Sequence, residues 1–264
     1  MITHRYNAPM EFANTVVVVT GASSGIGHAT AVACAARGGA VLATGRDAAA
    51  LDAVVAQIEA AGGRAEACAV DLTSDEGPRA VVAAAVAAYG GIDVLVNAAG
   101  IIATGAVDQT SDELWDRVMA LNVRAPFRLI REAAPHLRER RGAIVNVSSV
   151  NGLRAFAGLA AYNVSKAAID HLTRCAALDF AADGVRVNGV NPGMTITNLH
   201  KRGGMSDEQY AAFVERARTT HPLGRPGQAE EIAELILFLA SGRSGWVTGE
   251  TIAIDGGRHL TCNR

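Results

Sequence analysis

Short apolar runs alternate along the chain with longer stretches rich in alanine. The first run, Thr15–Thr20, places four valines between two threonines, which is typical of a strand buried on both faces of a sheet. Similar runs predict six further strands at Val41–Thr44, Ala65–Val70, Ile92–Val96, Ala143–Val147, Val185–Val190 and Thr251–Ile254. The segments between them are long enough for crossover helices, so the pattern predicts a doubly wound α/β domain with a seven-stranded parallel sheet flanked by helices.

Polar residues predict where several helices begin and end. Thr73 with Glu76, Thr110 with Glu113 and Ser206 with Gln209 have the spacing of a capping box. Gly62-Gly63 and Gly90-Gly91 predict helix ends. The polar, charged segment 195–225 is longer than an ordinary connection and precedes a helix expected near Pro226. We interpret it as a substrate lid within a single domain spanning residues 1–264.

Composition narrows the class of protein. The chain has 264 residues, of which 50% are hydrophobic and 19% charged, so a large core is expected and disorder is not. The net charge of −2 gives no electrostatic footprint for nucleic acid. No apolar run approaches a membrane span, and the start, MITHRYNAPMEF, has no apolar signal segment. We therefore expect a cytoplasmic protein without nucleic-acid or membrane partners.

The cysteines and histidines predict no metal site. The seven histidines show no metal-ligand spacing, and we expect no catalytic metal. The cysteines suit neither a zinc site nor a disulfide framework, because no two are close in the sequence: they are Cys34, Cys68, Cys175 and Cys262.

A glycine-rich turn directly follows the first predicted strand and opens a helix. Its glycines are Gly21, Gly25 and Gly27. The first permits a tight turn, the second lets the backbone approach a pyrophosphate, and the third lets helix and strand pack closely. A helix N-terminus also offers free N–H groups to an anion. The turn therefore favours a dinucleotide site over a plain glycine-rich connection.

The Gly-x-x-x-Gly-x-Gly spacing resembles the nucleotide signature of the short-chain dehydrogenase/reductase family, and the resemblance extends from about Thr15 to Gly257. It implies a Rossmann domain that binds a nicotinamide nucleotide through the turn residues Gly21, Ser23, Ser24, Gly25, Ile26 and Gly27. It implies further cofactor contacts from Asp71, Leu72, Asn97, Ala98, Gly100, Pro192, Gly193, Thr195 and Thr197. Ala98 departs from the family pattern, which has a second Asn there. Asp71 has the alternative role of a loop residue before Thr73.

Arg46 bears on which nucleotide binds. In NAD-binding units an acidic residue about 20 positions after the turn binds the ribose 2′-OH. The resemblance aligns Gly45 with that residue, and Arg46 follows it. A guanidinium can bind a 2′-phosphate, so we predict a preference for NADP(H), with NAD(H) as the alternative. Asp47 is the competing ribose ligand, although we prefer it as the N-cap of a helix over 48–60.

Tyr162 and Lys166 form the candidate catalytic pair. They lie four residues apart in a segment with helical spacing of apolar positions, and so on one helix face. Ser149 precedes Tyr162 by thirteen residues, at the end of a predicted strand. A nearby ammonium lowers the pKa of a tyrosine, ordinarily ~10, so we predict Tyr162 as general acid in reduction and general base in oxidation. Ser149 would donate a hydrogen bond to the substrate oxygen, with Ser148 as the adjacent alternative.

The family resemblance adds further roles at this site. Tyr162 and Lys166 would also contact the cofactor, Lys166 at the nicotinamide ribose, and Asn122 would hold a water in a proton relay to Lys166. Asn151 and Arg154 lie between Ser149 and Tyr162 and are expected to line the substrate pocket.

The sequence thus predicts an NADP(H)-dependent oxidoreductase that interconverts a ketone and a secondary alcohol. It resembles members of the 3-oxoacyl-carrier-protein-reductase and sugar or cyclic-alcohol dehydrogenase types, and no motif selects among their substrates. The alternatives are an NADPH-binding sensor, an NAD-dependent sugar or cyclic-alcohol dehydrogenase, and a nucleotide-sugar epimerase or dehydratase. Family resemblance over 246–257 implies a homotetramer, or a homodimer. His200, Lys201 and Arg202 in the lid would hold an acidic substrate or merely keep the loop soluble. The polar lid, which also carries Arg216, argues against bulky steroids.

Overall fold

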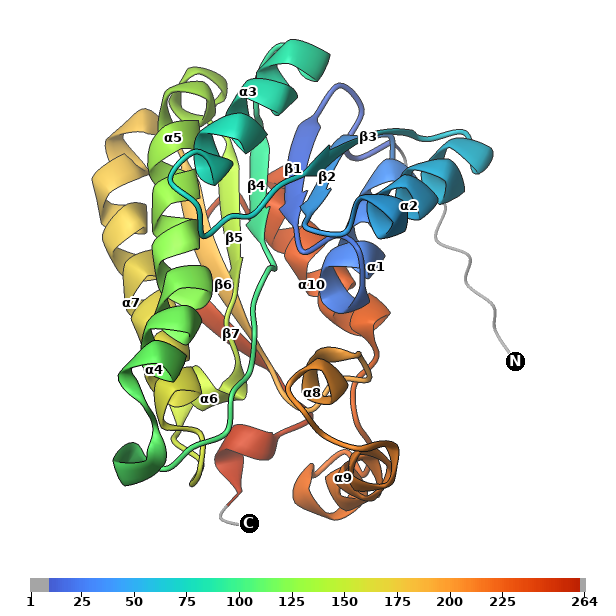
Figure 1. The fold of residues 1–264 in the computed structure, drawn as a ribbon. Coiled ribbons are helices and arrows are strands. Elements are labelled where there is room, and N and C mark those ends of the chain that lie inside the picture. The colour runs from blue at the N-terminus through green and yellow to red at the C-terminus, as the bar shows by residue number, and fades with distance from the viewer. Residues whose placement is uncertain (1–9, 262–264) are drawn as a thin grey trace.

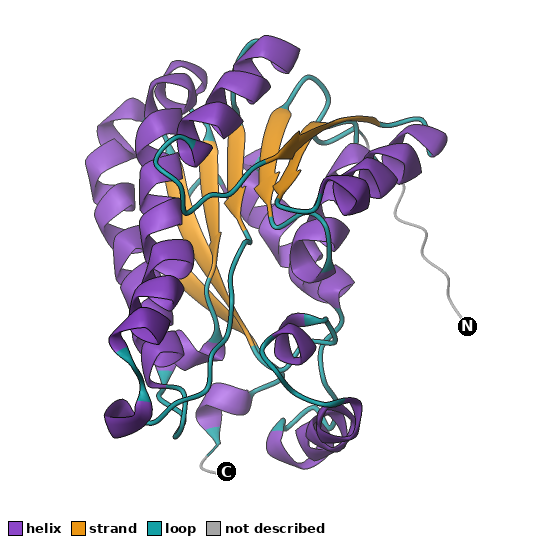
Figure 2. Cartoon of the chain, in the orientation of Figure 1, coloured by secondary structure: helices purple, strands orange, loops and turns teal. Residues whose placement is uncertain are grey.

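The computed structural model describes residues 10–261, which fold as one α/β domain around a parallel sheet (Figures 1 and 2). Segment 1–9, where we expect no signal segment, and Cys262 lie outside that range. Seven strands follow the order β3-β2-β1-β4-β5-β6-β7. They are β1 (Val16–Thr20), β2 (Ala40–Gly45), β3 (Arg64–Ala69), β4 (Val94–Asn97), β5 (Ala143–Val147), β6 (Arg186–Pro192) and β7 (Thr251–Ile254). The predicted fold class is confirmed.

Helices cover both faces of the sheet (Figure 2). They are α1 (Gly25–Ala35), α2 (Ala48–Ala60), α3 (Gly77–Tyr89), α4 (Asp112–Met119), α5 (Ala125–Arg140), α6 (Val150–Leu153), α7 (Ala160–Phe180), α8 (Leu199–Arg202), α9 (Asp207–Thr220) and α10 (Ala229–Ala240). A π-helical turn, Ala120–Arg124, joins α4 to α5, and a 3₁₀ turn, Arg258–Leu260, follows β7. No described helix is long and apolar enough to cross a membrane.

The apolar run of β1 supplies both halves of the core. Val17 and Val19 belong to the cluster that includes α1, α2 and α10. Val18, between them, belongs to the cluster that includes α3, α5 and α7. Because successive side chains of a strand point to opposite faces, a continuous apolar run is what a sheet covered on both sides requires.

Some predicted helix boundaries are wrong. Helix α3 begins at Gly77 with Glu76 as N-cap and Pro78 in the first turn, a position that proline favours. Thr73 instead donates from both its backbone N–H and its hydroxyl to the Asp71 carboxylate. The cap of α4 is Ser111 rather than Thr110, whose hydroxyl donates to the Ala106 carbonyl.

Other helix signals are confirmed. Ser206 and Gln209 form the capping box of α9, and Asp47 caps α2 by accepting from the Ala50 N–H at 3.1 Å. Gly90 takes the left-handed conformation that ends α3, and Gly62 has a φ of +80° just beyond α2. The helix expected near Pro226 begins at Ala229, after a second capping box formed by Gln228 and Glu231.

The strand order reverses at β1, which pairs with β2 on one side and β4 on the other. In such sheets the chain segments diverge outside the carboxyl ends of the strands and leave a crevice there. Segment 195–225 contains α8 and α9 and lies at this end, beside the C-terminal turn (Figure 1). The fold therefore gathers the loops after β1, β4, β5 and β6 at one edge.

Candidate active site

The turn after β1 is built around its glycines. Gly21 and Gly25 have φ values of +67° and +57°, a region that favours glycine. A Cβ on Gly27 would come within 2.4 Å of the Gly21 carbonyl oxygen. The N-cap of α1, Ser24, makes no side-chain cap hydrogen bond, so its side chain leaves the first N–H groups of the helix to an external anion. This cradle fits the pyrophosphate of a dinucleotide.

One cavity of about 1090 Å³ runs from this turn along the carboxyl edge of the sheet. Every predicted catalytic, cofactor-binding and substrate-pocket residue lines it except Asn97 and Asn122. Of the basic residues in segment 195–225, His200, Arg202 and Arg216 line it, whereas Lys201 pairs with Asp207. The described residues therefore bring together the glycine turn, Arg46, Asp71, Ser149, Tyr162, Lys166 and the Pro192–Thr197 segment.

The segment after β4 borders the cavity through its backbone. The Thr20 hydroxyl accepts hydrogen bonds from the Ala98 and Ala99 N–H groups, at 2.9 and 3.0 Å. The Asn97 side chain is buried and donates to Asn146 Oδ1 at 2.9 Å. Asn97 therefore ties β4 to β5, and its side chain does not line the cavity.

At the other end of the cavity, Arg46 is exposed directly after β2, while Asp47 is engaged as the α2 cap. Hydrogen bonds from Thr73, first from its N–H and then from its hydroxyl, lower the pKa of Asp71, and Arg46 contributes a further attraction. Asp71 is thus both a turn-forming residue and part of the cavity wall.

Ser149 is the N-cap of α6 and faces the cavity. Its hydroxyl donates to Asn151 Oδ1 at 3.1 Å and accepts from the Asn151 N–H. Asn163 fixes this arrangement, because it accepts from Asn151 Nδ2 at 2.7 Å and donates to the Phe156 carbonyl. The Ser148 hydroxyl donates instead to the Lys166 carbonyl, which leaves Ser149 as the better candidate.

Burial controls the protonation of Tyr162 and Lys166. Desolvation raises the pKa of Tyr162 to about 12, and a hydrogen bond with Ser149 opposes the shift. Desolvation lowers the pKa of Lys166 to about 8, opposed by the charge of Asp170. The Lys166 ammonium lies 5.6 Å from the centre of the Tyr162 ring and donates to the Val147 carbonyl at 2.9 Å. The shift of Tyr162 runs opposite to the lowering expected from the lysine, because desolvation is its largest cause.

A buried network beneath the pair was not predicted from the sequence. Asp170 accepts from Asn191 Nδ2 at 3.0 Å, and the same amide donates to the Ser149 carbonyl at 2.9 Å. A Cβ on Gly152 would come within 2.1 Å of Asp170 Oδ2. Asp170 follows Lys166 by four residues and so lies on the same helix face, which is the sequence signal that could have identified it.

Asn122 lies in the π-helical turn and is buried. Its side chain binds both backbone groups of Ile101, at 2.9 Å each, and donates to the Ser165 hydroxyl at 3.0 Å. A Cβ on Gly100 would lie 3.3 Å from Asn122 Oδ1 and 3.7 Å from Lys166 Nζ. Asn122 thus adjoins the lysine across Gly100, behind the cavity wall.

The Pro192–Thr197 segment leads into helices α8 and α9. Thr195 pairs with Gly227 across the base of the segment, and the Tyr210 hydroxyl of α9 binds the backbone of Thr197 on both its N–H and carbonyl sides. From α8, Arg202 Nη1 donates to Ser24 Oγ at 2.9 Å. This last contact, which the sequence did not predict, places the Arg202 guanidinium at the glycine turn.

The comparisons with known proteins agree with this geometry. The family described as Enoyl-(Acyl carrier protein) reductase matches residues 21–259. The chain is 37% identical to the 3-oxoacyl-[acyl-carrier-protein] reductase of Thermotoga maritima, covering 94% of this chain and 99% of that protein. It is also 37% identical to the meso-2,3-butanediol dehydrogenase of Serratia marcescens, over 94% and 96% of the two chains.

A solved structure has the same fold. The crystal structure of a short-chain dehydrogenase/reductase of unknown function from Caenorhabditis elegans, with cofactor, has a TM-score of 0.92 at 34% identity and covers 96% of this chain and 98% of that one. The chain belongs to the short-chain dehydrogenase/reductase family. It is an oxidoreductase that acts on a CH–OH group with a nicotinamide cofactor.

Proposed function

We propose that this enzyme interconverts a ketone and a secondary alcohol with NADP(H), using Ser149, Tyr162 and Lys166. The observation that carries the proposal is the single cavity that joins these three side chains to the glycine turn of β1. The turn, Asp71, Leu72, Ala98, Gly100 and the Pro192–Thr197 segment would hold the cofactor, with Lys166 and Tyr162 at its nicotinamide end. Asn97 and Asn122 would support it from behind the wall.

The bound nicotinamide supplies or accepts a hydride. With its pKa near 12, the Tyr162 hydroxyl is protonated at neutral pH and is placed to give its proton to a carbonyl oxygen. The Ser149 hydroxyl, which accepts from the Asn151 N–H, would turn its single proton from Asn151 Oδ1 to the same oxygen as negative charge develops there. Lys166 keeps a positive charge near the tyrosine ring below pH 8 or so, which would stabilise the phenolate that Tyr162 becomes after it gives up its proton.

Arg46 supports the preference for NADP(H) over NAD(H). Its guanidinium is exposed and lines the cavity next to Gly45. Gly45 stands where NAD-binding units carry an acidic residue, whose carboxylate would repel a 2′-phosphate. Asp47, the competing ribose ligand, is already used as the cap of α2. A 2′-phosphate would therefore meet a free cation at this position.

The substrate is a ketone or alcohol held between Ser149 and the α8–α9 segment, which we propose acts as a lid. The 3-oxoacyl reductase and butanediol dehydrogenase relatives suggest which substrates to test first for turnover. These are thioesters with a keto group and small uncharged ketones. Sugars and cyclic ketones complete it.

Nicotinamide absorbance tests this proposal directly. Turnover of at least one ketone with NADPH, and much slower turnover with NADH, is expected. Tyr162→Phe should abolish turnover while binding NADPH normally, because it removes only the hydroxyl group that supplies the proton. Equal activity of Tyr162→Phe and the wild type would refute the proposed mechanism, and equal use of the two nucleotides would refute the cofactor preference.

A further inference from the structure

Helix α8 is joined to the rest of the domain at the glycine turn. Its last residue, Arg202, donates from Nη1 to Ser24 Oγ at 2.9 Å. Among residues 10–261, this is the only hydrogen bond or ion pair that connects α8 to a residue outside segment 192–225. The polar attachment of α8 therefore depends on one arginine, and that arginine lies where the proposed function places the cofactor pyrophosphate.

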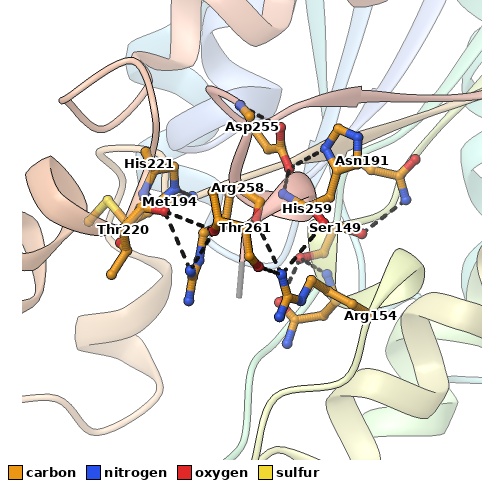
Figure 3. A network of polar contacts seen from close by, with 12 residues as sticks. Ser149, Arg154, Asn191, Met194, Thr220, His221, Asp255, Arg258, His259 and Thr261 are labelled. Atoms are coloured by element: carbon orange, nitrogen blue, oxygen red, sulfur yellow. Dashed lines mark hydrogen bonds and ion pairs between the residues drawn. The ribbon is translucent and has the colours of Figure 1, made fainter. Parts of the chain in front are cut away.

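Helices α8 and α9 form one unit that is closed at its base. The Met194 N–H, before α8, donates to Nε2 of His221, after α9, at 3.1 Å (Figure 3). Further out, the rings of His200 on α8 and Phe213 on α9 have centres 4.7 Å apart. A group that holds α8 in place therefore also holds α9.

The Arg202 guanidinium has no acidic partner within the described part of the chain. A guanidinium has five N–H donors, and the side chain of Arg202 uses one of them, on the neutral hydroxyl of Ser24. Ser24 is the N-cap of α1, whose first turn contains no acidic residue. The positive end of that helix dipole therefore has no carboxylate of its own, and an arginine lies beside it.

We propose that Arg202 is a cofactor-binding residue, which pairs with the pyrophosphate of the nicotinamide nucleotide and so fixes α8 and α9 against the glycine turn. This inference rests on the proposed function, because that function places the pyrophosphate at the N-terminus of α1. Arginine forms charge-assisted hydrogen bonds with phosphate oxygens. Arg46 and Arg202 then bind different phosphates: Arg46 binds the 2′-phosphate of NADPH, and Arg202 binds the pyrophosphate that NADPH and NADH share.

The pairing would connect the cofactor to the substrate pocket. His200, Phe213 and Arg216 belong to α8 and α9 and line the cavity. Because the two helices form one unit, a nucleotide that holds Arg202 also fixes this part of the cavity wall. The bound cofactor thus completes the substrate pocket before the ketone or alcohol enters.

The affinities of three nucleotides test the pairing without turnover. NADPH and NADH contain the pyrophosphate, whereas adenosine 2′-monophosphate has the 2′-phosphate and no pyrophosphate. In calorimetry, Arg202→Gln should weaken NADPH and NADH about tenfold each and leave adenosine 2′-monophosphate within about twofold of wild type. Arg202→Lys should retain part of the affinity, because it keeps the charge. Arg46→Gln should instead weaken NADPH and adenosine 2′-monophosphate and spare NADH.

Lys201→Gln is the matched control, because it removes one positive charge from the same helix. Lys201 pairs with Asp207 and lies 5.1 Å from the centre of the Tyr210 ring, both on α9. It does not line the cavity. Lys201→Gln should therefore bind all three nucleotides as the wild type does.

Hydrogen exchange of the backbone N–H groups tests the link to α8 and α9. Saturating NADPH should slow exchange in both helices of the wild type and of Lys201→Gln. In Arg202→Gln, also saturated with NADPH, the protection of α8 and α9 should be lost while that of α1 remains. Equal protection of α8 and α9 in Arg202→Gln and the wild type would refute the proposed link.

The binding results separate this inference from the proposed function. Unchanged affinity of Arg202→Gln for NADPH and NADH would overturn the inference, as would equal weakening of all three nucleotides. Weakening of NADPH and adenosine 2′-monophosphate alone would also overturn it, because Arg202 would then bind the 2′-phosphate. Ketone turnover combined with any of these results leaves the oxidoreductase function standing. Selective weakening of both dinucleotides by Arg202→Gln, without turnover of any ketone, would support the pyrophosphate contact and refute the proposed function.

Discussion

Tyr162 and Lys166 are only 5% and 6% exposed, and burial drives their pKa values in opposite directions. Each shift favours the neutral form of the side chain, so the tyrosine holds its proton more firmly and the lysine less firmly than in water. At the scale of single residues, the chemistry of this site is therefore set by desolvation as much as by the identity of the side chains.

The pH dependence of stability should report the buried lysine. Between its folded pKa of about 8 and its ordinary value, the unfolded chain binds a proton that the folded protein does not, so wild-type stability rises with pH. Lys166→Met lacks this contribution. From pH 8 to 10 the difference in unfolding free energy should move by about 2 kcal/mol in favour of the wild type. Urea denaturation at each pH measures it, and a constant difference would contradict the lowered pKa.

Arg46 decides cofactor choice in our proposal. Arg46→Gln removes the only cation expected at the 2′-phosphate, so kcat/KM for NADPH should fall about 10- to 100-fold and that for NADH should change little. Arg64→Gln is the control. Arg64 is exposed and begins β3, at the edge of the sheet opposite to the cofactor cavity. A variant that loses activity equally with both nucleotides would show that Arg46 does not read the phosphate.

At the scale of elements, the short helix α6 and the long helix α7 are in direct backbone contact beneath the site. Gly152 makes this possible, because a Cβ there would lie 2.1 Å from the Asp170 carboxylate and 3.0 Å from the Lys166 carbonyl. The contact holds Ser149, at the start of α6, in register with Tyr162 and Lys166 on α7. Precise placement of the hydroxyl therefore depends on a residue that never touches substrate.

Gly152→Ala should lower kcat by at least tenfold, since displacement of a reacting group by about 1 Å can cost 100-fold. Its affinity for NADPH should stay within a few-fold of wild type, because a Cβ at Gly152 would meet Asp170 and Lys166 and none of the glycine-turn residues. Gly158→Ala is the control: Gly158 has a φ of +75° but nothing within 4 Å of a Cβ, so only a stability cost of about 1 kcal/mol is expected. Unchanged kcat in Gly152→Ala would contradict this account.

At the scale of the whole molecule, large apolar side chains are exposed on neighbouring helices of one side. Phe127 on α5 is 47% exposed, and Val164 and Leu178 on α7 are 45% and 81% exposed. Helices α4, α5 and α7 lie together at one side of the sheet (Figure 1). Exposed apolar groups on neighbouring helices are typical of a surface that another chain covers, which supports the expected homo-oligomer, a tetramer or a dimer.

Light scattering should give a mass about four times the 27.2 kDa of one chain for the tetramer, or about twice that mass for the dimer. The double variant Phe127→Glu and Val164→Glu should dissociate, because charges at a closed symmetric interface are repeated in every copy. Leu223→Glu, at an exposed apolar residue between α9 and α10, serves as a comparison that should keep the wild-type mass. A monomeric wild type would refute the assembly.

Structural features that depend on neighbouring residues in the chain could be predicted from the sequence. The seven strands follow from apolar runs, and the glycine turn and the Tyr162–Lys166 pair follow from fixed spacings, because burial on a sheet and neighbours on a helix leave a periodic trace. Helix starts were less certain: Ser206 was placed correctly, whereas Thr73 and Thr110 were not. Several polar residues near a helix start can each serve as its cap, and packing decides between them.

The sequence by itself determined the fold class and the family, and it identified Ser149, Tyr162 and Lys166 as candidates, since these signals are short motifs and runs of residues close together in the chain. Only the tertiary structure decided that Arg202 reaches the glycine turn, that Gly152 meets Asp170, and that burial raises the pKa of Tyr162. Contacts between distant segments and the removal of water from a side chain leave no periodic signal, because they arise when the whole core closes.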